Sequence, residues 1–330
     1  MRKILILAAK VTLGILVSLI LGWLAIRGLD WTDVSKSILS TSPTLLLVGV
    51  GVFIAASYIR AIRWYILLTT KSVSINRLFL IQNAGIGINN IFPIRIASEI
   101  AQIALLTVRG NVSKSTAVTS IGMERLIDLM SSTFLLALGL SYVSETRAFA
   151  KYGWASFGAT VTIILILFMV SMHSNKINFT GKLSFLSSLT KSMSVLIQNK
   201  LVLLKSLTLS IIYWIMVGIT AWIVAQSVDI SISPLSSTLV IMTTIFFATL
   251  IPAAPSAIGS FEWAMVYILG FLGVEKDVGF SYAVVTHTVF FLPPIIIAMI
   301  FLPREGMFSI SKAKFLMKNG LIKKSEISNT

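Results

Sequence analysis

The sequence predicts an all-α polytopic membrane protein, with six full spans and two re-entrant helical hairpins arranged as an inverted repeat. Three observations lead to this fold class. The 330 residues are 56% hydrophobic and only 12% charged, whereas a soluble domain carries about 25% charged residues. Long apolar runs recur along the chain, and Lys and Arg gather between them. A chain of this composition cannot cover itself with polar surface, so lipid is the environment that accepts it.

Six apolar runs are long enough to cross a hydrocarbon core about 30 Å thick, which needs about 20 helical residues. These predicted spans are 4–26, 43–67, 117–143, 153–172, 206–226 and 279–302. The first follows Arg2 and Lys3 and is longer than the apolar part of a signal peptide, so we expect an uncleaved helix.

Two further apolar regions, 78–108 and 235–273, are interrupted near their middle. The interruptions in the first are Gly85, Gly87, Asn89, Asn90, Pro93 and Arg95. Those in the second are Pro252 and Pro255. Such breaks free backbone groups that lipid cannot satisfy, so they persist only inside protein or beside a wet cavity. We therefore predict two re-entrant hairpins. Two ordinary helix pairs with short loops are the alternative.

The distribution of Lys and Arg predicts the orientation. The segment 173–205 carries five Lys and no acidic residue, and the residues after Pro303 form a short basic tail. We expect both of these segments and the N-terminus to lie in the cytoplasm, with residues 1–303 forming one domain of the cytoplasmic membrane and 304–330 a cytoplasmic tail. The stretch 183–204 fits either an interfacial helix or a plain cytosolic linker helix.

The two interrupted regions also suggest an internal repeat. Glu99 follows the first break and lies 25 residues before Glu124, and Glu262 follows the second break and lies 25 residues before His287. In the predicted orientation the units 43–143 and 206–302 are inverted relative to each other. Inverted repeats with broken helices near the midplane are typical of transporters.

Charged groups inside a membrane cost at least about 2.5–3.5 kcal/mol each, so each needs a partner or a function. The candidate substrate-binding residues are Arg60, Arg63, Arg95, Glu99, Glu124, Arg125, Asp128, Glu262 and His287. The eight charged ones comprise four basic and four acidic residues, so they can neutralise one another.

The placement of these residues leaves two interpretations open for most of them. Glu124 and Asp128 share a helix face and predict either a polar seam facing a cavity or a salt-bridge network between helices. Arg60 and Arg63 predict either snorkelling cations or a clamp for a lipid phosphate. Arg95 lies at a helix start, which favours an anion.

Glu262 and His287 occupy corresponding places in the second unit. Glu262 has no basic neighbour in sequence, so it is a candidate for a proton-coupled carboxylate or for the partner of an arginine. His287 could titrate near neutral pH or serve as a neutral, hydrogen-bonded core residue.

Several function classes are disfavoured by composition. The absence of Cys and the presence of only two His argue against disulfides, metal clusters and cofactors. No nucleotide-binding or hydrolase motif is present, so we expect no enzyme, although Glu124 and Asp128 could serve as acid and base in a membrane-embedded lipid transferase. The net charge of +15 fits loops beside anionic lipid rather than nucleic-acid binding.

Four motifs in order resemble the lysylphosphatidylglycerol synthase transmembrane, or flippase-like, family. They are Arg60-x-x-Arg63-Trp64, Pro93-x-Arg95-x-x-Ser98-Glu99, Glu124-Arg125-x-x-Asp128 and Pro252-x-x-Pro255-x-x-x-Gly259-x-x-Glu262. The resemblance implies a stand-alone lipid translocase without a catalytic domain. Its cargo would be an anionic or aminoacylated phospholipid or a polyprenyl-linked glycan, held in a central polar cavity.

The same resemblance also allows other roles and partners. A homo-oligomer and a glycosyltransferase or lipid-synthase partner are compatible with it. Alternative functions are a non-catalytic accessory protein of a lipid or glycan pathway and, because midplane carboxylates suit ions, ion transport.

Overall fold

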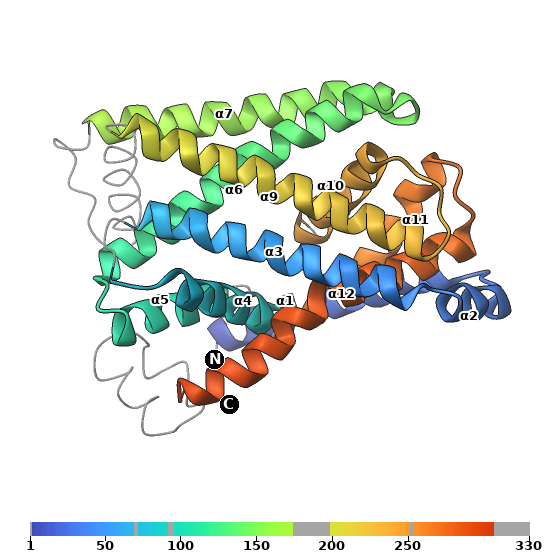
Figure 1. Cartoon of the computed structure of the whole chain (residues 1–330), viewed down its shortest axis with the longest axis horizontal. Helices are drawn as coiled ribbons and strands as arrows, with labels where there is room; N and C mark the ends of the chain where they lie inside the picture. The colour runs from blue at the N-terminus through green and yellow to red at the C-terminus, as the bar shows by residue number, and fades with distance from the viewer. Residues whose placement is uncertain (1, 69–71, 92–95, 174–198, 251–253, 307–330) are drawn as a thin grey trace.

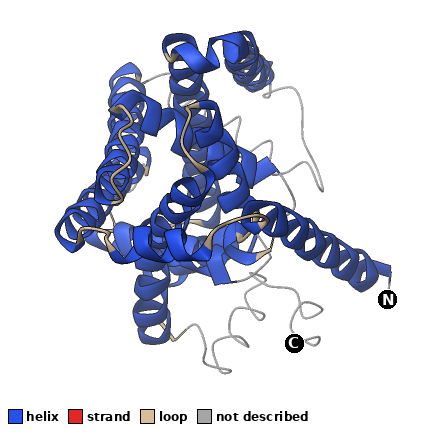
Figure 2. Ribbon diagram, turned by 90° about the vertical axis from the view of Figure 1, so that its right-hand side faces the viewer, coloured by secondary structure: helices blue, strands red, loops and turns tan. Residues whose placement is uncertain are grey.

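The chain was analysed as a computed structural model, which describes residues 2–68, 72–91, 96–173, 199–250 and 254–306. The regular secondary structure of this part is helical throughout, and it contains no strand (Figures 1 and 2). The helices before the 174–198 gap are α1 Arg2–Ile26, α2 Trp31–Leu39, α3 Pro43–Leu67, α4 Ile75–Ile91, α5 Ile96–Arg109, α6 Lys114–Tyr142, η1 Ser144–Phe149 and α7 Ala150–His173. Those after it are α9 Lys200–Ser227, α10 Pro234–Leu250, η4 Pro255–Ala257, α11 Ser260–Phe271 and α12 Lys276–Arg304.

Four helical stretches in the described residues are long and apolar enough to cross a membrane. They are Pro43–Leu67, Ser144–Leu167, Lys200–Ser227 and Lys276–Arg304. A fifth is obtained if α1 and α2, which meet at 90°, count as one broken span. The predicted span 117–143 corresponds to the 29-residue helix α6. Its charged and polar residues make α6 less apolar than the four stretches named above.

One segment differs from the sequence-based expectation. The connection 27–42 between the predicted spans 4–26 and 43–67 contains the helix α2. Asp30 caps its start by accepting a hydrogen bond from the Thr32 backbone N–H at 2.8 Å. The end of the predicted stretch 183–204 is helical, because residues 200–204 begin α9, which Asn199 caps. Residues 183–198 lie outside the described part of the chain.

The bundle is organised around three long helices. In Figure 1, α3 and α9 lie side by side while α12 crosses behind them, and α12 packs along α4. One apolar core joins α3 and α9 to α10, α11 and α12, and includes Phe53, Trp214 and Phe261. A second core joins α3 to α4, α5 and α6, and includes Trp64 and Leu106. These cores fix the charged faces of α3 and α6 relative to each other.

Each interrupted region forms two helices packed against each other, α4 with α5 and α10 with α11. The two regions also touch. The Ser256 hydroxyl donates to the Asn90 carbonyl at 2.6 Å, and the Asn90 amide donates to the Phe291 carbonyl of α12 at 3.4 Å. The Ala254 N–H donates to the Ser18 hydroxyl of α1 at 2.7 Å. The ends of the two breaks therefore lie together, although Pro93 and Pro252 themselves fall outside the described residues.

Candidate functional site

Two arginines of α3 meet two carboxylates of α6. Glu124 Oε1 lies 2.9 Å from Arg60 Nε and 3.0 Å from Arg63 Nη2. Asp128 forms ion pairs with the same two residues, 3.4 Å from Arg60 Nη2 and closer still to Arg63. The helical spacings, three on α3 and four on α6, place each pair on one face. The four charges therefore form a closed network, with both guanidinium groups turned into the protein.

This network is buried and electrically balanced. The Arg63 side chain is 0% exposed and that of Glu124 only 3%. Two positive and two negative charges cancel, which offsets part of the penalty of placing them away from water. Of the alternatives open for Glu124 and Asp128, the geometry corresponds to an interhelical salt-bridge network that holds α3 against α6.

Three further residues complete the network from neighbouring helices. Ser210 of α9 accepts a hydrogen bond from Arg63 at 2.7 Å and donates one to Asp128 at 3.3 Å. Gln82 of α4 donates to Glu124. The Tyr213 ring lies 5.5 Å from the Arg60 guanidinium carbon, within cation–π range. Sequence analysis did not identify these residues, because a lone Ser, Gln or Tyr in an apolar helix carries no local signal.

A second pair is much more open. Arg125 Nη2 lies 3.4 Å from Glu99 Oε1, and the two side chains are 46% and 34% exposed. The roughly 100° helical offset from Glu124 turns Arg125 away from the buried network. Arg95, the other expected neighbour of Glu99, lies outside the described residues.

The first interrupted region carries several buried acceptor atoms without a donor in the described part of the protein. They are Gln82 Oε1, Asn89 Oδ1 and Glu99 Oε2. All three are oxygens, and buried oxygens of this kind are normally satisfied by protein or by water. The region therefore offers hydrogen-bond acceptors to water or to a ligand bearing N–H groups.

Glu262 and His287 form the third group. The Glu262 carboxylate accepts from the Gly259 backbone N–H at 2.6 Å and also meets His287 Nδ1. The His287 ring packs against those of Phe261 and Phe291, with centroids 4.7 and 4.1 Å away. Glu262 thus has a histidine as its partner rather than one of the described arginines, and it also caps the start of α11.

A group that the sequence analysis missed lies at the end of α12. Glu305 accepts from Arg77 at 3.0 Å and pairs with Arg109 at 3.3 Å. It ties α12 to the beginning of α4 and the end of α5. Across the described residues, no three His, Asp or Glu side chains are placed to hold a metal ion together.

The comparisons with known proteins agree with the motifs. The family described as "Lysylphosphatidylglycerol synthase TM region" matches residues 11–298. A UPF0104 membrane protein of Methanocaldococcus jannaschii is 28% identical over 200 residues, which cover 59% of this chain and 83% of the relative. A UPF0104 membrane protein of Methanothermobacter thermautotrophicus is 22% identical over 291 residues, covering 78% and 85%. The predicted resemblance is confirmed: the chain is a multi-pass membrane protein that belongs to the lysylphosphatidylglycerol synthase TM region family.

Proposed function

We propose that this protein moves a lipid between the leaflets of the cytoplasmic membrane, with the headgroup passing between two re-entrant hairpins. The observation that carries the proposal is the meeting of the two helix breaks through Ser256 and Asn90. Two broken helices that meet inside one bundle are the arrangement that transporters use for midplane binding sites.

Helix lengths support the hairpin interpretation. The returning arms α5 and α11 have 14 and 12 residues, or about 21 and 18 Å at ~1.5 Å per residue. A hydrocarbon core is about 30 Å thick, so neither arm crosses it alone. With both arms re-entrant, α1, α3, α6, α7, α9 and α12 are the six spans, 43–143 and 206–302 are inverted repeats, and both termini are cytoplasmic.

The open pair suggests how a headgroup is held. The Arg125 guanidinium is suited to a phosphate. The Glu99 Oε2 atom beside it has no donor among the described residues and is suited to an ammonium group. A phospholipid with a phosphate and an amine, such as an aminoacylated one, matches both. A polyprenyl-linked glycan would use the phosphate position alone.

The test is leaflet exchange of fluorescent phospholipids in proteoliposomes. We expect Glu99→Gln, Arg125→Gln and Glu262→Gln each to slow exchange by about tenfold, since each removes one charged contact worth roughly 1.4 kcal/mol. Glu145→Gln is the matched control, because Glu145 is an exposed carboxylate on η1. Wild-type exchange no faster than that of empty liposomes, with every phospholipid tried, would contradict the proposal.

A non-enzymatic accessory role in a lipid or glycan pathway is the second candidate. It is favoured by the buried network, which uses four of the predicted site residues to hold helices together. In that case a glycosyltransferase, a lipid synthase or a second copy would be the partner, and the three Gln variants would leave pathway output unchanged. A lipid transferase is disfavoured, because Glu124 and Asp128 are both held in ion pairs with Arg60 and Arg63. Product formation from a radiolabelled lipid by the protein alone would reverse that choice.

A further inference from the structure

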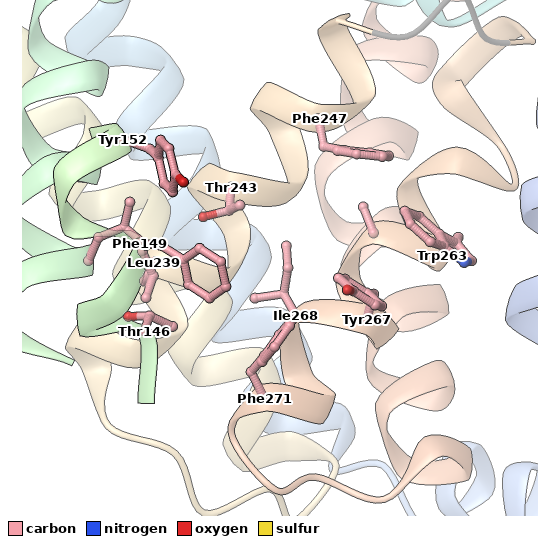
Figure 3. Close-up of a pocket in the computed structure, with 12 residues that line it drawn as sticks. Thr146, Phe149, Tyr152, Leu239, Thr243, Phe247, Trp263, Tyr267, Ile268 and Phe271 are labelled. Carbon is pink, nitrogen blue, oxygen red and sulfur yellow. The ribbon is translucent and has the colours of Figure 1, made fainter. Parts of the chain in front are cut away.

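A cavity of about 310 Å³ lies between the end of α6, η1, α7 and the two arms of the second interrupted region (Figure 3). Its volume is within the range of ligand pockets, about 300–1,000 Å³. Aromatic rings dominate its wall and come from η1, α7, α10 and α11. They are Phe149, Tyr152, Phe247, Trp263, Tyr267 and Phe271.

The lining excludes a charged ligand. No Lys, Arg, Asp, Glu or His lines the cavity, and the polar side-chain groups of its lining residues are hydroxyls and the Trp263 indole N–H. The Thr146 hydroxyl already donates to the Val143 carbonyl at 3.2 Å. The Thr243 hydroxyl is buried without a hydrogen-bond partner among the described residues, and Figure 3 shows it on the same side of the cavity as the Tyr152 hydroxyl. The cavity therefore suits a hydrocarbon group and not a lipid headgroup.

An unfilled cavity of this size would be unfavourable, because the atoms that line it would lose dispersion contacts on one side. The cavity is partly open to its surroundings, which in a membrane protein include lipid chains. Transfer of a chain from lipid to this cavity brings no hydrophobic gain. The gain comes instead from packing against rings such as the stacked pair Trp263 and Tyr267, whose centroids are 5.1 Å apart.

The cavity lies where a bound group would contact both α10 and α11. Trp263 follows Glu262 directly in α11, and Thr243 and Phe247 belong to the opposing arm, α10. A chain in the cavity therefore contacts both arms of the second interrupted region at once.

We propose that this cavity binds one acyl chain of a membrane phospholipid and thereby stabilises the packing of α10 and α11 against η1 and α7. The bound lipid is distinct from the transported one, because the charged residues of the headgroup site do not line this cavity. The binding does not require that the protein transport lipid.

The experiment uses the full chain in nanodiscs containing a phospholipid with a photoactivatable diazirine on one acyl chain. Crosslinked peptides are mapped by mass spectrometry. We expect the 239–247 and 263–271 segments to be labelled about tenfold more than the exposed face of α7 around Thr162. In Thr243→Phe, whose larger side chain fills the cavity, we expect the labelling of these segments to fall by a similar factor. Thr162→Phe makes the same exchange on an exposed position of α7 and is expected to leave the labelling unchanged.

Ile268→Trp fills the cavity from α11 and provides a second variant should Thr243→Phe not fold, as judged by thermal unfolding. Equal labelling of the cavity and of the Thr162 face would mean annular lipid only, and would overturn the proposal. So would labelling that survives in the folded filled variants, or labelling obtained with a polyprenyl probe but not with the acyl probe. Because the readout is binding, labelling without any leaflet exchange would retain this site while removing the proposed transport.

Discussion

Replacing Arg63 by leucine is expected to lower the free energy of unfolding by about 3–5 kcal/mol, the usual cost of breaking a buried ion pair from one side. Arg63 is 0% exposed and contacts both Glu124 and Asp128. Without it, two carboxylates share the single guanidinium group of Arg60, and the buried network acquires a net negative charge. Chemical unfolding in detergent micelles, followed by circular dichroism, measures the loss.

Two companion variants isolate the electrostatic cause. Lys36→Ala breaks an exposed ion pair with Asp33, whose side chains are 70% and 60% exposed, and should change the stability by only about 0.5 kcal/mol or less. Arg63→Leu combined with Asp128→Leu restores a neutral pair of Arg60 and Glu124 and should recover part of the loss. An Arg63→Leu protein as stable as the Lys36→Ala protein would show that the network does not hold α3 to α6.

Gly259→Ala is the second substitution with a large expected effect, a loss of at least about 2 kcal/mol. Gly259 has φ of +84°, which side-chain-bearing residues rarely adopt. A Cβ atom there would also lie 2.3 Å from the Ser18 carbonyl oxygen of α1. The substitution would therefore strain the turn that positions Glu262 and would push α1 away from α11. Thermal unfolding of the purified protein measures the effect.

The matched control lies in α11, the helix that Gly259 caps. Gly270 of α11 has open space where its Cβ would be, so Gly270→Ala should be neutral or raise the stability by up to about 1 kcal/mol, because alanine favours a helix. Equal behaviour of the two alanine variants would contradict the close packing of α1 on the second break. The glycine variants measure how the packing of α1 on the second break contributes to stability. The Arg63 variants measure the contribution of the charge network.

The sequence determined the helical class and the approximate bounds of most described helices, because these depend on local composition. The first interruption was placed too early, because α4 continues through Gly85, Gly87, Asn89 and Asn90 to Ile91. The predicted spans 43–67, 206–226 and 279–302 fall inside α3, α9 and α12. A long run of apolar residues predicts a membrane-spanning helix, however the other helices pack around it. The helix α2 within 27–42 was not predicted, because it has only nine residues and is less apolar than the spans.

The sequence did not show which side chains of different helices contact each other. All four charged residues of the buried network were identified from the sequence, because charged residues are rare in apolar helices. The choice between a polar seam facing a cavity and a salt-bridge network between helices depended on α3 and α6 lying face to face. The partner of Glu262, the attachment of Glu305 and the aromatic cavity likewise depend on helices far apart in the chain. Local sequence fixes which helix face a side chain occupies, whereas packing of the whole bundle decides which other face it meets.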